Sequence, residues 1–380
     1  MRICIVAPYF TPFVRGNEFG LAESLFKLGN DVTIVTSTSR APREKMVASG
    51  KGDEPNYNFK VKYLRTLVDV FENPIVPTAF IEILRGDYDV VLLQEDYPNI
   101  CHMAFFASKI KRVPTVLSTE RNYMPSDISK RVGLSFFDKT INRIVRNGVD
   151  VFTAHCLAAK DFMNDMMGVD RDIKVIHVGV DTKLFRPISD PEDFFQGEDD
   201  ELRILSVARL HKHKGLVHLT QAMKGVIRDI PNAKLYIIGR GAEEQKLKSL
   251  VNALDLSRSI SFIQTAIPND MMPHVHSSCD LYVQPSIVEP FGIAVLEAMA
   301  CAKPVIASNV GGMKDTVVDG HTGFLVPPGD VKDLKDKIVE LLTNREKRSV
   351  MGRNGRKRAV AHFDWMKIGA EYQKLLKSIS

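Results

Sequence analysis

The sequence lacks the features that mark several protein classes. Its five cysteines are odd in number, and no two have the Cys-x-x-Cys spacing of zinc sites. We therefore expect reduced core cysteines in a cytoplasmic protein. No apolar run approaches the roughly 20 residues that span a bilayer. The apolar run at residues 1–8 is too short for a signal peptide and predicts a first strand.

Charge and length narrow the class further. The net charge of +5 is too small to indicate nucleic-acid binding. A hydrophobic content of 44% and a charged content of 26% are typical of globular proteins. A chain of 380 residues is too long for one compact core, so we expect two domains.

Strand and helix patterns alternate through the first half of the chain. Residues 2–7 are typical of a strand buried on both faces of a parallel sheet. A helical pattern then ends at Gly29-Asn30, and a strand is predicted at residues 31–37. This βαβ unit predicts a doubly wound sheet with ligand sites at the carboxyl ends of its strands. Further strands are predicted at residues 89–93, 115–118, 150–154 and 174–178, with helices between them.

The pattern breaks around residues 179–187, and an acidic stretch at 189–201 indicates an interdomain connection. The alternation then restarts. Strands are predicted at residues 203–208, 233–238, 260–263, 280–285 and 304–307, and helices at 216–228, 242–254, 269–277, 330–343 and 365–379. We interpret most of residues 309–315 and 319–326 as turns and packing. We predict Rossmann-like domains at residues 1–183 and 184–362, and a terminal helix in 363–380 that packs back on the first domain.

Residues 286–300 form the stretch around which the second half is organised. A buried strand is followed by a turn containing Pro290 and Gly292 and then by a helix from about residue 291 to 302. Backbone N–H groups at such a helix start form an anion site, most naturally for phosphate. Glu289 precedes the helix, and Glu297 lies about 9 Å further along it. A sugar–diphosphate–ribose ligand would suit this arrangement; an ordinary capping carboxylate and an exposed glutamate are the alternative.

This stretch resembles the donor-site signature of the family-4 retaining glycosyltransferases. Glu289 and Glu297 occupy the two positions of their Glu-x7-Glu string, and the surrounding residues Pro285-Ser286, Pro290-Phe291-Gly292 and Ala298-Met299-Ala300 match as well. The resemblance covers nearly the whole chain and is weak only between residues 41 and 73. It implies an α/β protein of GT-B fold, with two doubly wound Rossmann-like domains facing each other across a cleft.

Two further segments match the family. Arg209 and Lys214 occupy the cationic positions of its Arg-Leu…Lys-Gly segment, which holds the donor diphosphate, although a solvated basic loop would look similar. Gly239 and Gly241 match its Gly-x-Gly turn, which turn geometry alone could also explain. The resemblance implies catalytic roles for Glu289, Arg209 and Lys214. It implies donor contacts from Gly16, Gly239, Gly241, Phe291, Gly292, Ile293 and Glu297.

The first domain departs from the family pattern. The usual glycine pair reads Gly16-Asn17, and the histidine that faces the donor sugar in many relatives is missing. Carboxylates stand in its place after two predicted strands. We therefore predict an acidic acceptor pocket with candidate contacts from Glu18, Asp96 and Glu120, while solvated loop carboxylates are the alternative.

A metal site is not expected. Asp87-Tyr88-Asp89 and Asp170-Arg171-Asp172 are Asp-x-Asp strings, but both lie at strand starts, the wrong end of the sheet. No cofactor is expected beyond the nucleotide-diphosphate sugar, which serves as substrate.

Residues 128–146 place apolar side chains at helical spacing among basic ones. A basic amphipathic helix can lie on an anionic lipid surface, which would put the protein at the inner face of a membrane. We favour the alternative, a core-packed helix with a solvated basic face.

Together these features predict a retaining glycosyltransferase. It would move a hexosyl group from a UDP-, GDP- or ADP-linked sugar to a glycan, lipid or small-molecule acceptor, without a metal. Two alternatives remain. A GT-B nucleotide-sugar 2-epimerase would not be expected to carry this Glu-x7-Glu string, and a non-catalytic nucleotide-sugar-binding protein would fit the altered first domain.

Overall fold

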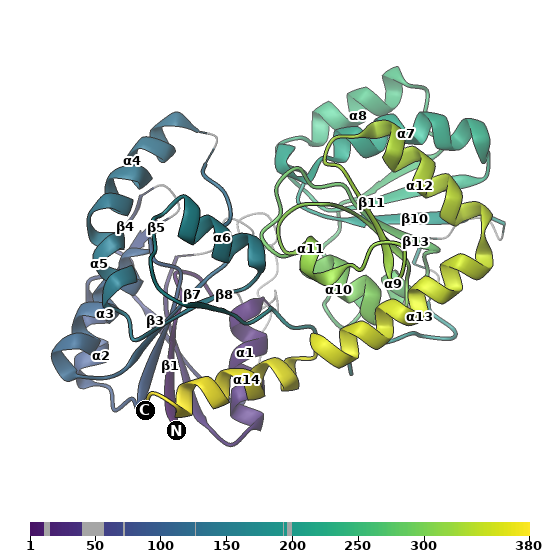
Figure 1. Cartoon of the computed structure of the whole chain (residues 1–380). Helices are drawn as coiled ribbons and strands as arrows, with labels where there is room; N and C mark the ends of the chain where they lie inside the picture. Colours follow the sequence, from purple (N-terminus) through teal and green to yellow (C-terminus); the bar gives the residue numbers. More distant parts are fainter. Residues whose placement is uncertain (11–15, 40–56, 71–72, 126, 193, 196–199) are drawn as a thin grey trace. The chain divides into compact units, whose positions relative to one another are not determined.

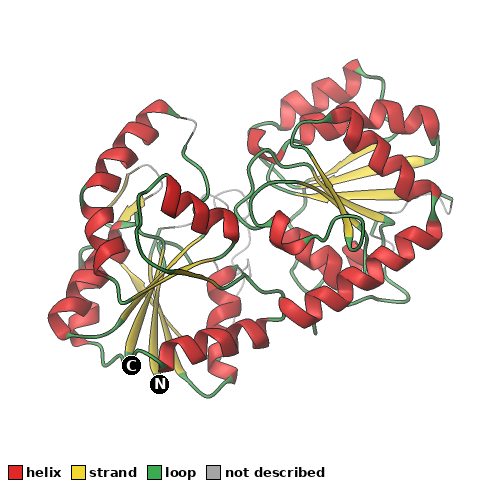
Figure 2. Ribbon diagram, viewed as in Figure 1, coloured by secondary structure: helices red, strands yellow, loops and turns green. Residues whose placement is uncertain are grey.

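The computed structural model describes the chain except for residues 11–15, 40–56, 71–72, 126, 193 and 196–199 (Figure 1). The chain divides into two compact units. Unit 1 comprises Met1–Gly179 and Trp365–Ser380, and unit 2 comprises Val180–Asp364. Each unit is a parallel sheet with helices on both faces (Figure 2). None of the helices built from the described residues is both long and apolar enough to cross a membrane.

The sheet of unit 1 has seven strands in the order β3-β2-β1-β6-β7-β8-β9. The central strand β1 pairs in parallel with β2 through Ile3 and Val32, and with β6 through Ile3 and Val90. Every residue of β6 and β7 is buried, as expected for strands covered on both faces. The strands are β1 Arg2–Val6, β2 Asp31–Ser37, β3 Lys60–Leu64, β6 Val90–Gln94, β7 Thr115–Thr119, β8 Val151–Ala154 and β9 Ile173–Val175.

A short antiparallel ribbon of β4 Val68–Val70 and β5 Asn73–Ile75 lies outside this sheet. The helices of unit 1 are α1 Asn17–Lys27, α2 Thr78–Arg85, α3 Asn99–Lys111, α4 Ile128–Lys139, α5 Ile141–Gly148, α6 Leu157–Asp165 and α14 Trp365–Lys377.

The sheet of unit 2 has six parallel strands in the order β12-β11-β10-β13-β14-β15. The chain proceeds outward from β10 in one direction and from β13 in the other, so the strand order reverses between these two. Ligands of doubly wound sheets bind at such a switch point. The strands are β10 Leu202–Val207, β11 Ala233–Ile238, β12 Ile260–Ile263, β13 Leu281–Gln284, β14 Val305–Ser308 and β15 Gly323–Val326. The helices are α7 Leu216–Asp229, α8 Glu244–Ala253, α9 Met272–Ser277, α10 Ile293–Ala300, α11 Met313–Thr316, α12 Val331–Thr343 and α13 Arg345–His362, with a turn of 3₁₀ helix at Lys212–Lys214.

The predicted strands are confirmed to within a few residues, whereas β3, β15, the β4–β5 ribbon and α13 were not predicted. The interpretation of residues 319–326 as turns is wrong for Gly323–Val326, which form the edge strand β15. A side chain at Gly323 would lie 2.2 Å from the carbonyl oxygen of Val305, so the glycine permits the pairing. Helix α13 has two glycines that weaken its helical pattern. A side chain at one of them, Gly352, would lie 2.1 Å from the carbonyl oxygen of Ala302.

The segment at residues 128–146 differs most from its prediction. It is two helices that meet at Thr140, and the core-packed interpretation is wrong for the first of them. All twelve residues of α4 are described, and Asp138 alone among them is buried. Four large apolar side chains of α4, those of Ile128, Val132, Phe136 and Phe137, are instead exposed.

Helix α14 belongs to unit 1 although it is the last helix of the chain. Its residues Ile368, Tyr372 and Leu376 lie in the core with β1 and α1. The Tyr372 hydroxyl is 2.9 Å from Oγ of Ser118 on β7. Trp365, the single tryptophan, lies directly against Gly20 of α1, where an added Cβ would come within 2.0 Å of the indole. All five cysteines of the chain are free and buried, as predicted.

We predict that Gly20→Ala displaces the indole of Trp365 and lowers the melting temperature. Overpacking of this kind costs about 1–3 kcal/mol. Because Trp365 is the single tryptophan, its fluorescence emission should shift to longer wavelength at the same time. Gly133→Ala is the matched control, since nothing lies within 4 Å of a side chain added there. Equal melting temperatures and spectra for the two variants would contradict this packing.

Candidate active site

Three loops meet at the carboxyl edge of the unit 2 sheet. They follow β10, β11 and β13, and parallel strands bring their carboxyl ends to one edge. Backbone hydrogen bonds join them: the N–H of Leu210 donates to the carbonyl of Arg240 at 2.9 Å, and that of Ile287 to the carbonyl of His213 at 2.8 Å. The predicted donor residues of this domain therefore lie on connected loops.

Glycines allow the loops to approach so closely. Gly215 has φ +63°, and a Cβ there would lie 1.9 Å from the carbonyl oxygen of Pro285. Gly239, with φ +150°, approaches the carbonyl of Ala208 equally closely. A Cβ at Gly241 would lie 2.2 Å from the carbonyl oxygen of Leu210. The glycines of the Gly-x-Gly turn are therefore needed for packing between the loops. This packing role is compatible with the predicted donor contact but is no evidence for it.

A chain of polar contacts connects Lys214 with the end of β13. Nζ of Lys214 donates to Oε2 of Glu289 at 2.6 Å, and the hydroxyl of Ser286 donates to the same oxygen at 2.9 Å. Nε2 of Gln284 donates to the Ser286 hydroxyl at 2.9 Å, and the Tyr282 hydroxyl donates to Oε1 of Gln284 at 2.8 Å. Glu289 is buried, with 7% of its surface exposed. The structure thus pairs two of the three residues to which the sequence analysis gave catalytic roles.

The loop that carries Lys214 is strongly cationic. Arg209 is exposed on it, and Lys212 lies on the turn before Lys214. Burial, together with the surrounding cations, lowers the pKa of His211 and His213 from their ordinary value. An anion bound here would meet lysine and arginine charges and two neutral imidazoles.

Helix α10 begins at Ile293, two residues later than predicted, after Gly292 with φ +93°. The N–H groups of Val295 and Leu296 donate back to the carbonyl of Gly292. The first N–H groups of a helix have no partner inside it, so those at Ile293 and Ala294 lie at the positive end of the α10 dipole. The Phe291 side chain is buried against Phe363, at 6.3 Å between ring centroids, so any donor contact at Phe291 involves its backbone.

Glu297 lies partly exposed on α10, beside a histidine that the sequence analysis missed. Nε2 of His276 is 3.7 Å from Oε2 of Glu297. His276 is fully buried, and its ring also faces Tyr282 and Phe185. Both ring nitrogens lack a hydrogen-bond partner among the residues that the structure describes. No sequence signal could have found His276, because it lies on α9, which a strand and a loop separate from α10 and Glu297.

In unit 1, Gly16 and Glu18 lie at the start of α1. Gly16 is the N-cap residue in an extended conformation, and Glu18 lies partly buried in the first turn. Asn17, which replaces the second family glycine, contacts Nε2 of His155 through its amide nitrogen at 3.0 Å. His155 follows β8 and is buried, and burial lowers its pKa to about 4. The substituted position therefore joins α1 to the carboxyl edge of the first sheet.

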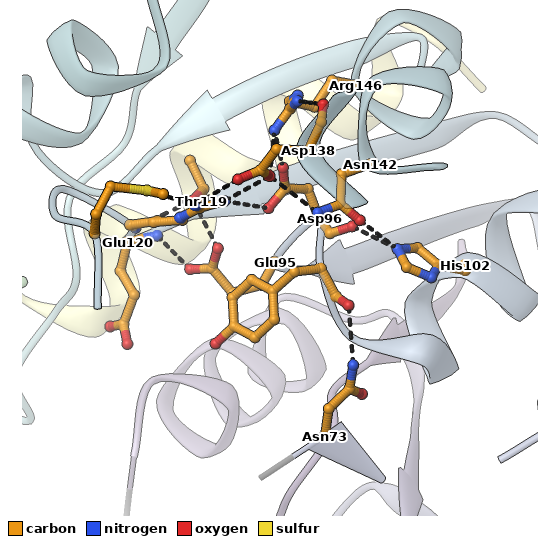
Figure 3. A network of polar contacts seen from close by, with 12 residues as sticks. Asn73, Glu95, Asp96, His102, Thr119, Glu120, Asp138, Asn142 and Arg146 are labelled. Atoms are coloured by element: carbon orange, nitrogen blue, oxygen red, sulfur yellow. Dashed lines mark hydrogen bonds and ion pairs between the residues drawn. The ribbon is translucent and has the colours of Figure 1, made fainter. Parts of the chain in front are cut away.

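Asp96 does not face an acceptor pocket, contrary to prediction. It is fully buried and accepts a hydrogen bond from Arg146 at 2.7 Å (Figure 3). Arg146 also donates to Asp138 at 3.1 Å, and Asp138 accepts from Arg121 at 2.7 Å. The interpretation of Asp96 as a solvated loop carboxylate is wrong as well. Its environment is a buried ion-pair network between β6, β7 and α4–α5.

The preceding residue, Glu95, lies at the carboxyl end of β6 instead. Its backbone has φ +75°, a strained value for a residue other than glycine. Its carboxylate accepts hydrogen bonds from Oγ1 of Thr119 at 2.7 Å and from the N–H of Glu120 at 2.6 Å (Figure 3). Burial and the charges of Glu120 and Asp96 raise the pKa of Glu95 to about 8. The exposed Glu120, which was predicted, and Glu95, which was missed, therefore lie together at this edge.

The Asp-x-Asp strings lie at strand starts, as predicted. Asp89 precedes β6 and accepts from the backbone N–H of Arg2 at 2.8 Å, and Asp172 precedes β9. Within the described part of the chain, no group of three or more metal-binding side chains could hold an ion.

Comparisons with known proteins identify the family of this chain. Residues 189–358 match the family model described as glycosyl transferases group 1, and residues 19–184 match the model described as glycosyltransferase family 4. The chain belongs to this glycosyltransferase family. It is therefore a glycosyltransferase, and its two sheets form the GT-B fold.

Named relatives cover much of the chain. It is 29% identical over 268 residues to the GDP-mannose-dependent alpha-(1-6)-phosphatidylinositol monomannoside mannosyltransferase of Mycolicibacterium smegmatis, which covers 67% of this chain and 70% of that protein. It is 26% identical over 393 residues to the phosphatidyl-myo-inositol mannosyltransferase of Mycobacterium leprae, covering 100% and 97%. Among solved structures, Anabaena HepE in complex with UDP superposes with a TM-score of 0.81 at 21% identity and covers 100% of both chains.

The raised pKa of Glu95 predicts a pH dependence of stability. Between about pH 4.5 and pH 8 the folded protein holds a proton on Glu95 that the unfolded chain releases. Stability attributable to this residue therefore falls as pH rises through that window. We therefore expect the difference in melting temperature, Glu95→Gln minus wild type, to increase by several degrees between pH 4.5 and pH 8. Glu120→Gln should narrow this pH range, because it removes a neighbouring negative charge that raises the pKa of Glu95. If the melting temperatures of all three proteins changed with pH in the same way, the raised pKa of Glu95 would be contradicted.

Proposed function

We propose that this glycosyltransferase takes a nucleotide-diphosphate sugar as donor and transfers its hexosyl group with retention of anomeric configuration. The observation that carries the proposal is the pairing of Lys214 with Glu289 beside the start of α10. A cation, a buried carboxylate and a helix amino terminus gather at the switch point of the unit 2 sheet. These are the groups that a sugar diphosphate requires.

In this proposal the diphosphate lies at the start of α10. Lys214, Arg209 and the N–H groups near Ile293 stabilise the negative charge that develops as the diphosphate leaves. Such electrostatic stabilisation is commonly the largest single contribution to catalysis. No metal is required, because cations and a helix terminus already meet the charge. The nucleoside side of the donor extends toward Glu297, whose carboxylate would bind ribose hydroxyls.

Glu289 has the role of holding the donor sugar. Its carboxylate accepts from Lys214 and Ser286, so the side chain is fixed in one orientation. The family resemblance implies a front-face reaction, in which the departing phosphate accepts the proton of the acceptor hydroxyl. A carboxylate already neutralised by a lysine suits a positioning role better than attack on the anomeric carbon.

The acceptor is the less defined substrate. The Mycolicibacterium relative is named for GDP-mannose and a phosphatidylinositol mannoside, and the Anabaena structure contains UDP. These names support a nucleotide-sugar donor and leave its base undecided. For this chain we propose a hydroxyl acceptor on a glycan or lipid, bound near Glu95 and Glu120 of unit 1.

Incubation with radiolabelled UDP-, GDP- and ADP-linked hexoses and a panel of glycan and lipid acceptors tests the proposal. Labelled product formed in the presence of EDTA supports metal-independent transfer. An epimerised donor without transfer would indicate a nucleotide-sugar 2-epimerase, and donor binding without turnover a non-catalytic binding protein. Activity that EDTA abolishes and only magnesium or manganese restores would refute metal independence.

We predict that Lys214→Ala and Arg209→Ala each lower turnover by about 100- to 1,000-fold, because each removes charge that stabilises the leaving diphosphate. Lys212→Ala is the matched control: it removes an exposed lysine from the same turn and should leave turnover nearly unchanged. Melting temperatures report whether each variant is folded. Equal rates in Lys214→Ala and Lys212→Ala would place the diphosphate elsewhere.

The proposed stereochemistry gives a separate prediction. An α-linked donor should yield an α-linked product, and Glu289→Gln should lose rate while no covalent sugar–enzyme adduct can be trapped in the wild type. Proton NMR of the first product formed measures the anomeric coupling. A β coupling from an α donor would refute retention, and a trapped adduct on Glu289 would refute the front-face mechanism.

A further inference from the structure

Helix α4 presents its apolar side chains outward. Ile128, Val132 and Phe136 recur every fourth residue and are 70%, 64% and 66% exposed, and Phe137 beside them is 50% exposed. Ile144 on α5 is 55% exposed. We call these five residues the apolar stripe. Single exposed apolar residues are normal on a protein surface, but a continuous helical stripe indicates an interaction site.

A buried charge explains why the stripe faces outward. Asp138 is the buried residue of α4, and it accepts hydrogen bonds from Arg121 at 2.7 Å and from Arg146 at 3.1 Å. Asn142 adds a third at 3.0 Å. Burial alone would raise the pKa of Asp138, but these partners hold it below its ordinary value. The polar contacts therefore attach α4 to unit 1 (Figures 1 and 3). The side chains of the apolar stripe are left for another partner.

Within residues 128–146 the exposed charges are all positive, and Asp127, the N-cap residue of α4, adds one exposed carboxylate at the start of the helix. Arg131, Lys139 and Arg143 are exposed, and Lys130 is partly exposed. Asp138 is the single acidic residue between positions 128 and 146, and its charge is buried in ion pairs. The exposed part of α4–α5 thus combines apolar and cationic side chains, the composition of helices that lie in a lipid interface.

We propose that α4 and the exposed side of α5 form a docking face for an anionic lipid bilayer. Ile128, Val132 and Phe136 enter the boundary between headgroups and acyl chains, while Arg131 and Lys139 meet the lipid phosphates. Helix α4 has twelve residues and is therefore about 18 Å long, which suits a helix lying in the interface. The face belongs to unit 1, whereas the proposed donor site belongs to unit 2, so the two can be tested separately.

Charge distinguishes a lipid surface from a second copy of the chain. A symmetric dimer through the stripe would bring the four cations of each copy against those of the other, and like charges repel. An anionic membrane offers complementary charge to all of them. Attraction of this kind is screened within about 10 Å at 0.1 M salt, so binding should depend on ionic strength.

The test is co-sedimentation of the full chain with vesicles of phosphatidylcholine alone and of phosphatidylcholine mixed with phosphatidylglycerol. We expect binding to the anionic vesicles at low salt, release at high salt, and little binding to the neutral vesicles. Arg131→Glu/Lys139→Glu should weaken binding by about tenfold or more, since each surface cation contributes about fivefold. Val132→Ser/Phe136→Ser should weaken binding by about tenfold or more as well, because it removes two apolar side chains that the interface would bury. All four substituted side chains are exposed, so folding should be retained.

Matched controls come from the same unit. Ile110→Ser removes an equally exposed apolar side chain from α3, and Arg85→Glu reverses an exposed charge on α2; both should bind vesicles as the wild type does. The thermal shift produced by UDP or by GDP should be the same in every variant, which separates this proposal from the proposed function. Absence of binding to anionic vesicles at low salt, or binding that the stripe variants leave intact, would overturn the proposal. So would a dimer that Val132→Ser/Phe136→Ser dissociates without any vesicle binding.

Discussion

The ion pair between Lys214 and Glu289 is the interaction on which the donor end of unit 2 depends. It joins the loops that leave β10 and β13, the two strands at the switch point. Removing one partner of a buried ion pair typically costs about 3–5 kcal/mol, so the buried carboxylate requires its lysine. The neighbouring Gly215 lets the lysine loop reach the carbonyl of Pro285. The buried charge of Glu289 therefore depends on the position of Lys214, and that position depends on the glycine at residue 215.

Unit 1 uses buried charge differently. Its network of Asp96, Asp138, Arg121 and Arg146 pairs two buried carboxylates with two buried arginines, and it holds α4 and α5 against the ends of β6 and β7. Because its carboxylates are buried and paired with arginines, this network positions the two helices. Glu95 and Glu120 remain as carboxylates at the edge of the sheet. The apolar stripe of α4 does not pack into the core of unit 1. One arrangement of charges thus accounts for both unusual features of this unit.

The sequence was sufficient for the parts of the fold whose signals are local. Apolar runs marked β1, β10 and β11, and the strand–turn–helix string from Pro285 to Ala300 marked the donor site. Strand β15 was not predicted because it is four residues long and begins with glycine. Helix α13 was not predicted because it is polar and contains two glycines. Asp96 was assigned wrongly because adjacent residues at a strand end point in opposite directions. Sequence order cannot reveal which of Glu95 and Asp96 is buried when the arginine partner lies fifty residues away. For the apolar residues of α4 the sequence left two directions open, inward to a core or outward, because helical periodicity does not tell which face packs inward.

The place of α14 in unit 1 has a consequence for the order in which the protein folds during synthesis. The first unit lacks Ile368, Tyr372 and Leu376 until α14 is made, after unit 2. All of unit 2, Val180–Asp364, is made before them. The face of α1 that contains Gly20 and Ser24, against which α14 packs, therefore stays uncovered while an entire second unit emerges from the ribosome. Domains usually fold in the order of their synthesis. Here the amino-terminal unit begins first and is completed last, so its apolar surface needs protection for the whole time that unit 2 takes to be translated.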